Sequence, residues 1–284
     1  MKEIFRRRYR HGQFGPGEIA VFIMLCLGVV LVAYPLFWVV MSSLKTTAAI
    51  SLDVWAPPKV PQWQNYLNAW NRGVSGYFIN SLVVTLSAIA GVLVISSLCA
   101  YGLARYRAPW LKYALILVMG GMMLNPQVCL IPLYGLLRTL RMHNTYFALI
   151  VPYIAFRLPL ITLLIRTFFL ATPKEIEESA TLDGCTDLQT FAHIFIPMSR
   201  PILLTGTILT AYYAWNEFLF AIIFIDSNKW RTIPAGLMSF RDALQVEWGP
   251  LLAGMTISAL PMIIFFISVQ KYFIRGMLSG SVKG

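Results

Sequence analysis

The chain has 284 residues, of which 58% are hydrophobic and only 12% are charged, and its formal net charge is +11. Soluble domains carry about 25% charged residues, so this composition excludes a soluble globular protein, and the 14% aromatic content excludes a disordered one. Nucleic-acid binding is not favoured either, because the basic residues flank apolar runs, where they orient a chain in the membrane. The composition predicts an integral membrane protein.

Six apolar runs are long enough to cross a bilayer, whose core of about 30 Å needs about 20 helical residues. They lie at residues 18–43, 79–104, 112–134, 146–171, 201–226 and 250–273. A β-barrel would instead show alternating segments of about ten residues, and backbone in hydrocarbon must satisfy its own hydrogen bonds. The sequence therefore predicts an all-α membrane fold with six transmembrane helices.

The regions outside these runs indicate the orientation of the chain. Lysine and arginine are concentrated in the tail at residues 1–17 and in the loops on the same side, so we expect both termini, including residues 274–284, in the cytoplasm. The first run exceeds the roughly 7–15 residues of a signal-peptide core, and we expect it to be retained as a span. Residues 44–75 would form an extracytoplasmic loop, and residues 76–273 the core.

The segment between the fourth and fifth runs, residues 172–200, is polar among apolar neighbours and carries signals for a helix start and stop. Thr172, Pro173 and Glu175 have the spacing of an N-cap, a first helical residue and the third residue of a capping box. Gly184 stands where a left-handed residue would end this short helix. We call this segment the connector.

A second short helix is expected after the glycine. Thr186 and Gln189 have the spacing of another capping box, and the helix they start would run to about Ile194 and end at Pro197. Two short helices joined at a tight corner form a shape that suits docking, although the capping signals alone fit a plain connection equally well.

The connector resembles the EAA loop of the membrane subunits of ABC importers, which reads E-A-A, three residues, G, nine residues and I-x-L-P. The matching residues are Glu178-Ser179-Ala180, Asp183-Gly184 and Ile194-x-Ile196-Pro197, in which Ser179 and Ile196 replace an alanine and a leucine. Further segments are similar to MalG-type subunits of carbohydrate importers: Asn65-Tyr66, residues 78–82, 100–105, 131–134, 214–218 and 280–284.

The resemblance implies a type I ABC importer permease fold in which the connector is a cytoplasmic coupling-helix loop. It implies these partners: a second, MalF-like permease subunit, an ATPase subunit dimer and an extracytoplasmic substrate-binding protein. The chain would be a non-catalytic permease for a carbohydrate, by subfamily an oligosaccharide, in the plasma membrane of a bacterium or archaeon. Since the chain lacks a G-x-x-x-x-G-K-[ST] loop, ATP and Mg are expected on the partner ATPase, and this chain is expected to bind no cofactor and no metal.

The resemblance also assigns roles within the connector. Contact with the ATPase would involve Glu178, Ser179, Ala180, Asp183, Gly184, Ile194 and Pro197. Gly184 would set the corner, and Glu178 and Asp183 would provide hydrogen bonds and charge complementarity.

Polar residues within the spans are candidates for the sugar path, because they are costly in lipid and normally face protein or water. They are Asn125, Gln127, Tyr153, Arg157, Tyr212, Asn216 and Glu217. Asn216 and Glu217 would serve equally well as hydrogen-bonding groups between helices or toward a partner subunit.

Two other classes of function stay open. A self-contained secondary transporter or channel would show paired ionisable residues at the midplane and an internal repeat, and only Arg157 and Glu217 are strong candidates for such a pair. A membrane enzyme is less favoured, because the sequence contains neither H-E-x-x-H nor G-x-S-x-G and its three histidines are dispersed.

Overall fold

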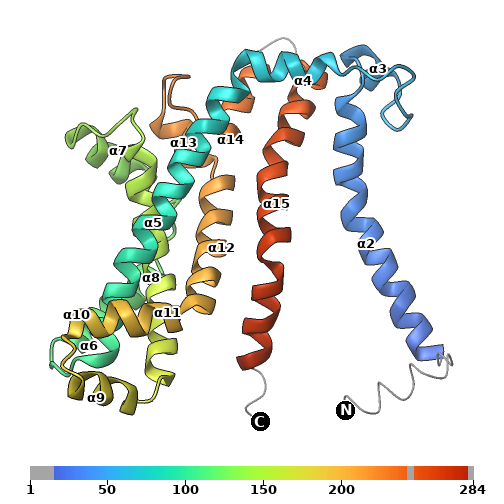
Figure 1. Ribbon diagram of the computed structural model, residues 1–284. Coiled ribbons are helices and arrows are strands. Elements are labelled where there is room, and N and C mark those ends of the chain that lie inside the picture. Colours follow the sequence, from blue (N-terminus) through green and yellow to red (C-terminus); the bar gives the residue numbers. More distant parts are fainter. Residues whose placement is uncertain (1–15, 242–245, 281–284) are drawn as a thin grey trace. The chain divides into compact units, whose positions relative to one another are not determined.

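The computed structural model describes residues 16–241 and 246–280, with side chains described for residues 17–241 and 246–270 (Figure 1). Apart from two single bridge residues, Arg241 and Val246, every regular element within these ranges is helical. The predicted all-α membrane fold is confirmed.

The helices follow one another along the whole described chain. In order they are α2 (Pro16–Ser43), α3 (Thr47–Leu52), α4 (Gln64–Ala69), η1 (Trp70–Val74), α5 (Ser75–Arg105), α6 (Leu111–Gly121), α7 (Leu130–Thr139), α8 (Phe147–Ala171), α9 (Glu175–Leu182), α10 (Asp187–Thr190), η2 (Phe191–Phe195), α11 (Ile196–Met198), α12 (Arg200–Asn216), α13 (Leu219–Phe224), α14 (Ile233–Gly236), η3 (Leu237–Phe240) and α15 (Trp248–Gly280).

The chain divides into two compact units, and each is described by itself. The first contains α2, α3, α4 and the beginning of α15 as far as Thr256, and the second contains the elements from η1 to η3 and the rest of α15.

In the first unit, polar side chains fix the loop that follows α2. Lys45 is only 3% exposed, and its ammonium group donates to the carbonyl oxygens of Asp53 (3.2 Å) and Val54 (3.1 Å). The amide of Asn65 donates to the carbonyl of Lys45 at 2.8 Å, and the indole of Trp38 donates to that of Val54 at 3.0 Å. These bonds satisfy loop carbonyls that have no helical partner.

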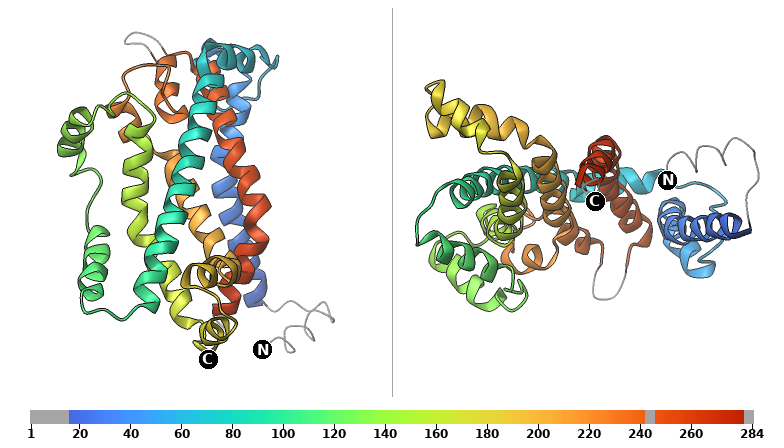
Figure 2. Two further views of the ribbon diagram at one scale, coloured as in Figure 1. Left: turned by 60° about the vertical axis from the view of Figure 1, so that its left-hand side comes forward. Right: turned by 90° about the horizontal axis from the view of Figure 1, so that it is seen from below.

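In the second unit, α5 packs along α8 and α12 packs against both (Figure 2). The helices approach closely where small residues meet large ones, as at Gly91 of α5, which lies directly against Ile154 of α8. One buried cluster surrounds Tyr153 and Phe220, and another surrounds Tyr101 and Phe169 at the end of α5 and α8 that leads into the connector.

The expected membrane runs correspond to helices of different kinds. Four stretches of the described chain are long and apolar enough to cross a membrane, within α2, α4 to α5, α8 and α15, and a fifth is obtained if α12 is joined to the helices before it across a 75° bend. The first, second, fourth and sixth expected runs each coincide with one long helix. The total of six spans stays a prediction.

The other two runs are interrupted rather than continuous. The run at 112–134 consists of α6 and α7 with turns at 122–129, where the side chain of Asn125 accepts from the amide of Gln127 at 2.9 Å and Pro126 offers no amide proton. The run at 201–226 is α12 followed by α13, with Glu217 and Phe218 between them. Hydropathy alone carried no signal for either break.

Candidate functional site

The connector begins with α9, which ends at a left-handed glycine as the sequence predicts. Gly184 has φ +82°, its amide donates to the carbonyl of Thr181 at 3.0 Å, and the amide of Cys185 donates to that of Ala180 at 2.9 Å. This pair of bonds is the Schellman arrangement, which satisfies the last carbonyls of a helix and turns the chain sharply.

The second capping box is confirmed. The hydroxyl of Thr186 accepts from the amide of Gln189 at 3.4 Å, and the side chain of Gln189 accepts from the amide of Thr186 at 2.8 Å. These reciprocal bonds start α10 immediately after the glycine corner.

The first capping box is wrong. Thr172 is the C-cap of α8, and its hydroxyl donates to the carbonyl of Phe168 at 3.2 Å instead of capping α9. Helix α9 starts after Lys174 without a side-chain cap, with Glu175, Glu177 and Glu178 in its first turn. The threonine therefore serves the helix before it, which needs its carbonyls satisfied just as much.

The predicted end of the second helix also differs. The chain continues through Ile194 and Pro197 in helical form, as η2 and then α11, and turns at Ser199 into α12. Pro197 lies in α11 directly after the π-helical turn η2, so a residue without an amide proton stands inside this continuous helical stretch.

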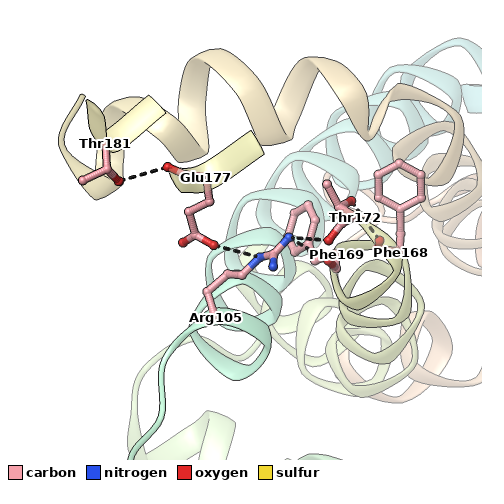
Figure 3. Close-up of polar contacts among 6 residues, drawn as sticks. All are labelled: Arg105, Phe168, Phe169, Thr172, Glu177 and Thr181. Carbon is pink, nitrogen blue, oxygen red and sulfur yellow. Dashed lines mark hydrogen bonds and ion pairs between the residues drawn. The ribbon is translucent and has the colours of Figure 1, made fainter. Parts of the chain in front are cut away.

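Arg105, at the last turn of α5, fastens the connector to the helix bundle (Figure 3). Its guanidinium donates to the carbonyl oxygens of Phe169 (3.0 Å) and Thr172 (3.1 Å) at the end of α8, and its Nε lies 3.5 Å from the carboxylate of Glu177 in α9. The guanidinium also lies 4.7 Å from the ring centroid of Phe195. One cation thus joins α5, α8, α9 and η2, and it compensates the negative end of the α8 dipole.

A buried aromatic cluster supports the same junction. Tyr101 lies one turn before Arg105. Its ring centroid is 5.2 Å from the ring centroids of Phe191 and Phe195 in η2 and 6.1 Å from that of Phe169 in α8. Such packing transmits displacement because close-packed side chains leave no room for independent movement.

Tyr106 adds a polar contact at the surface of this junction. Its hydroxyl donates to the carboxylate of Asp187 in α10 at 2.6 Å. This hydrogen bond, with smaller effects from burial and from neighbouring carboxylates, raises the pKa of Tyr106.

The seven predicted ATPase-contact residues divide by exposure. Glu178, Ser179, Asp183, Gly184 and Pro197 are exposed, Ile194 is half-buried and Ala180 is buried. The connector also carries two strongly exposed leucines, Leu182 (89%) and Leu188 (68%).

The hydrogen bonds that the sequence predicts for Glu178 and Asp183 within the connector are made by other residues. Neither carboxylate makes a side-chain bond within the described residues, and the ion pair of the connector is made by Glu177, with Arg105 of α5. Sequence reasoning missed Tyr101, Arg105 and Glu177, although residues 100–105 carried a signal as a family-like segment.

Two of the candidate path residues, Tyr153 and Glu217, meet between α8 and the break after α12, and a third, Arg157, contacts a neighbouring tyrosine of α12. The hydroxyl of Tyr153 donates to Glu217 at 2.8 Å, and the same carboxylate accepts from the amides of Phe220 (2.8 Å) and Ala221 (3.2 Å). Glu217 therefore starts α13 in the manner of an N-cap. Arg157, one turn along α8 from Tyr153, lies with its guanidinium 3.8 Å from the ring centroid of Tyr213.

The other four candidates take no part in these contacts. Asn125 and Gln127 lie in the turns between α6 and α7, while Asn216 donates to the carbonyl of Tyr212 at 2.8 Å within α12. Tyr212 and Asn216 are exposed.

Comparison with known proteins gives a consistent result. Residues 92–279 match the model of a family described as "Binding-protein-dependent transport system inner membrane component". The chain is 53% identical over 268 residues to the "Probable ABC transporter permease protein YurM" of Bacillus subtilis (strain 168), covering 94% of this chain and 89% of that protein. It is 32% identical over 281 residues to the "Arabinooligosaccharides transport system permease protein AraQ" of the same strain, covering 97% and 99%.

The fold is also similar to that of a solved structure. A chain in the crystal structure of a bacterial ABC transporter involved in the import of the acidic polysaccharide alginate superposes with a TM-score of 0.79. The alignment covers 92% of this chain and 99% of that chain at 20% sequence identity, so the likeness is one of fold.

Proposed function

Because the chain belongs to the family of binding-protein-dependent transport system inner membrane components, we propose that it is the permease subunit of an ATP-driven carbohydrate importer. It forms half of the translocation path and couples to a separate ATPase subunit through the connector. The chain itself catalyses no reaction, and ATP and Mg bind to the partner ATPase.

The carbohydrate substrate class is supported by the relatives. One relative is named for arabinooligosaccharide transport, and its alignment with this chain covers nearly the full length of both. We therefore assign an oligosaccharide to this chain as well. Exposed polar and aromatic side chains near the break after α12, such as Asn216 and Tyr212, provide the groups that sugars bind.

The contacts of Arg105 are the single observation on which the proposed coupling role rests. A force applied to the exposed face of α9 and α10 reaches α5 and α8 directly, because Arg105 and Tyr101 join the connector to the ends of both helices. The glycine corner keeps the two short helices at a fixed angle. The connector thus acts as a rigid lever between an ATPase and the spans.

The exposed leucines explain how the ATPase would grip this lever. Leu182 and Leu188 are too exposed to stabilise the chain alone, and burying them in a cleft of another subunit removes apolar surface from water. Glu178 and Asp183 are exposed and have no side-chain partner among the described residues, so they are available to basic residues at the rim of that cleft.

The remaining partners and the topology follow from this role. A second, MalF-like permease subunit completes the path, an ATPase dimer binds on the cytoplasmic side and an extracytoplasmic binding protein delivers the sugar. Both termini lie in the cytoplasm, and the protein resides in the plasma membrane of a bacterium or archaeon.

Co-expression with the genes of its partners tests the proposal. The tagged chain is expected to co-purify with an ATPase, and Leu182→Asp is expected to abolish that association without preventing membrane insertion. Leu52→Asp in α3 is the matched control, since Leu52 is 87% exposed but lies outside the connector, and it should retain the ATPase. Solute movement by the chain alone in liposomes would instead identify a self-contained transporter and refute the proposal.

A further inference from the structure

Arg157 lies near the middle of the long apolar helix α8, and no described side chain of opposite charge pairs with it. It lies about 15 Å from the N-terminal end of α8 at about 1.5 Å per residue. Among the residues that the structure describes, none forms an ion pair with it, and its buried Nε has no hydrogen-bond acceptor. A cation at this depth is costly unless a partner compensates it.

Glu217, the acidic residue among the candidate path residues, is already occupied by other hydrogen bonds. Glu217 accepts hydrogen bonds from Tyr153 and from the amides of Phe220 and Ala221, and it lies beyond ion-pair distance of Arg157. Within the described part of the chain, the charged contact of Arg157 is therefore with the face of the Tyr213 ring, whose centroid lies 3.8 Å from the guanidinium carbon.

The surroundings favour a polar interior over lipid. Helix α12 ends at Asn216 and α13 begins at Leu219, and such non-helical backbone is tolerated at membrane depth only within protein or beside a water-filled cavity. Asn216, three residues from Tyr213 on the same side of α12, is exposed at this break. Broken helices of this kind mark solute sites in membrane transporters.

We propose that Arg157 and Tyr213 form an anion-binding subsite, and that the transported carbohydrate carries a carboxylate, sulfonate or phosphate group. The guanidinium presents two terminal NH groups to two oxygens of such a group, and the stacked tyrosine fixes the plane in which they point. This inference rests on the proposed function, because it requires that α8 and α12 line the path. An acidic residue of the second permease subunit is the competing partner for Arg157.

Chemical protection of Arg157 tests the subsite without knowledge of the natural sugar. The complete purified complex is treated with phenylglyoxal, an arginine-specific reagent, in the presence of glucuronate or glucose, and modification of the 147–171 peptide is followed by mass spectrometry. Glucuronate, but not glucose, is expected to slow the reaction at Arg157. Equal rates with both sugars, or no reaction at all because a partner carboxylate covers the guanidinium, would overturn the proposal.

Paired sugars test whether the subsite sets specificity. Cells that express the full transporter receive oligosaccharides that differ only in a carboxylate or a hydroxymethyl group at C6. Arg157→Gln and Tyr213→Leu should reduce uptake of the acidic member by about tenfold or more relative to the neutral one, whereas Tyr213→Phe keeps the ring and should not. Sulfonated and phosphorylated members of the panel identify which anion is preferred.

A matched control separates this effect from a general loss of activity. Arg138 also lies over a tyrosine, 5.9 Å from the ring centroid of Tyr134, but it is exposed in the last turn of the short helix α7, so Arg138→Gln should leave the ratio of acidic to neutral uptake unchanged. Import of only neutral sugars by a complex that hydrolyses ATP would refute the anion subsite alone. Absence of any associated ATPase would refute the proposed function itself.

Discussion

Substitution of Gly184 is expected to weaken coupling through the backbone alone. Its φ of +82° lies in the left-handed region, and a Cβ built there meets nothing within 4 Å, so a larger side chain has space but an unfavourable conformation. An L-residue in this region costs about 1–2 kcal/mol, and a β-branched residue costs more. That cost shifts the corner toward other conformations by roughly 5–30-fold.

The order of the variants is the test. Asparagine tolerates the left-handed region best, so sugar-stimulated ATP hydrolysis and uptake by the reconstituted complex should fall in the order Gly184→Asn, Gly184→Ala and Gly184→Val. Membrane insertion should be unaffected in all three. Gly135→Ala is the matched control, since Gly135 lies within α7, where a Cβ also meets nothing within 4 Å and helical backbone accepts alanine. Equal coupling in the asparagine and valine variants would refute the argument.

Three further changes have definite expected results. Arg105→Gln removes charged hydrogen bonds that join the connector to α8, and sugar-stimulated ATP hydrolysis should fall by about tenfold or more in the purified complex. Tyr106→Phe removes the hydrogen bond to Asp187. Because this bond raises the pKa of Tyr106, its contribution to stability is complete below the unfolded-state pKa of about 10 and is lost as the pH rises through the higher folded-state pKa. The difference in stability between wild type and variant, measured by thermal unfolding, should therefore shrink at high pH. Gly236→Ala places a methyl group against the buried ring of Tyr77 and should lower stability by about 1–3 kcal/mol, measured by denaturation in detergent.

Each of these expectations has a result that contradicts it. Wild-type stimulation in Arg105→Gln would mean that the connector transmits force without the arginine. A stability difference for Tyr106→Phe that does not change with pH would show that the phenol contributes only by packing. Unchanged stability of Gly236→Ala would mean that the ring of Tyr77 can move aside.

The helix caps show what local sequence can and cannot decide. Thr186 is the N-cap of α10 after the glycine corner and Gln189 lies within that helix, so their spacing determines their reciprocal bonds. Thr172 stands between two helices and can bond to either. Its hydroxyl bonds backward to α8, a choice that depends on where α8 ends and that the spacing of three residues does not contain.

The residues that fasten the connector were beyond sequence reasoning for a different reason. Arg105 and Glu177 are separated by more than seventy residues and meet only because α5 and α8 pack along each other. An arginine at the end of an apolar run has an ordinary explanation as an orientation signal. Only the packed helices reveal that its guanidinium faces inward.

The interrupted runs illustrate the limit of hydropathy. Residues 112–134 and 201–226 are apolar enough to be read as single spans, yet each contains a helix break. At 217–218 the break is stabilised by Glu217, whose carboxylate replaces the missing helical acceptors for two amides. A carboxylate that serves backbone is indistinguishable in sequence from one that binds a solute.

Arg105 grips α8 through main-chain oxygens, and this has an evolutionary consequence. The carbonyl groups of residues 169 and 172 exist whatever side chains stand there, so those positions can drift in sequence without releasing the guanidinium. The number of residues in α8 before these carbonyls cannot change in the same way. Inserting or deleting one helical residue turns the carbonyls by about 100° and shifts them by about 1.5 Å. Selection at this joint is therefore expected to act on spacing more strongly than on side-chain identity.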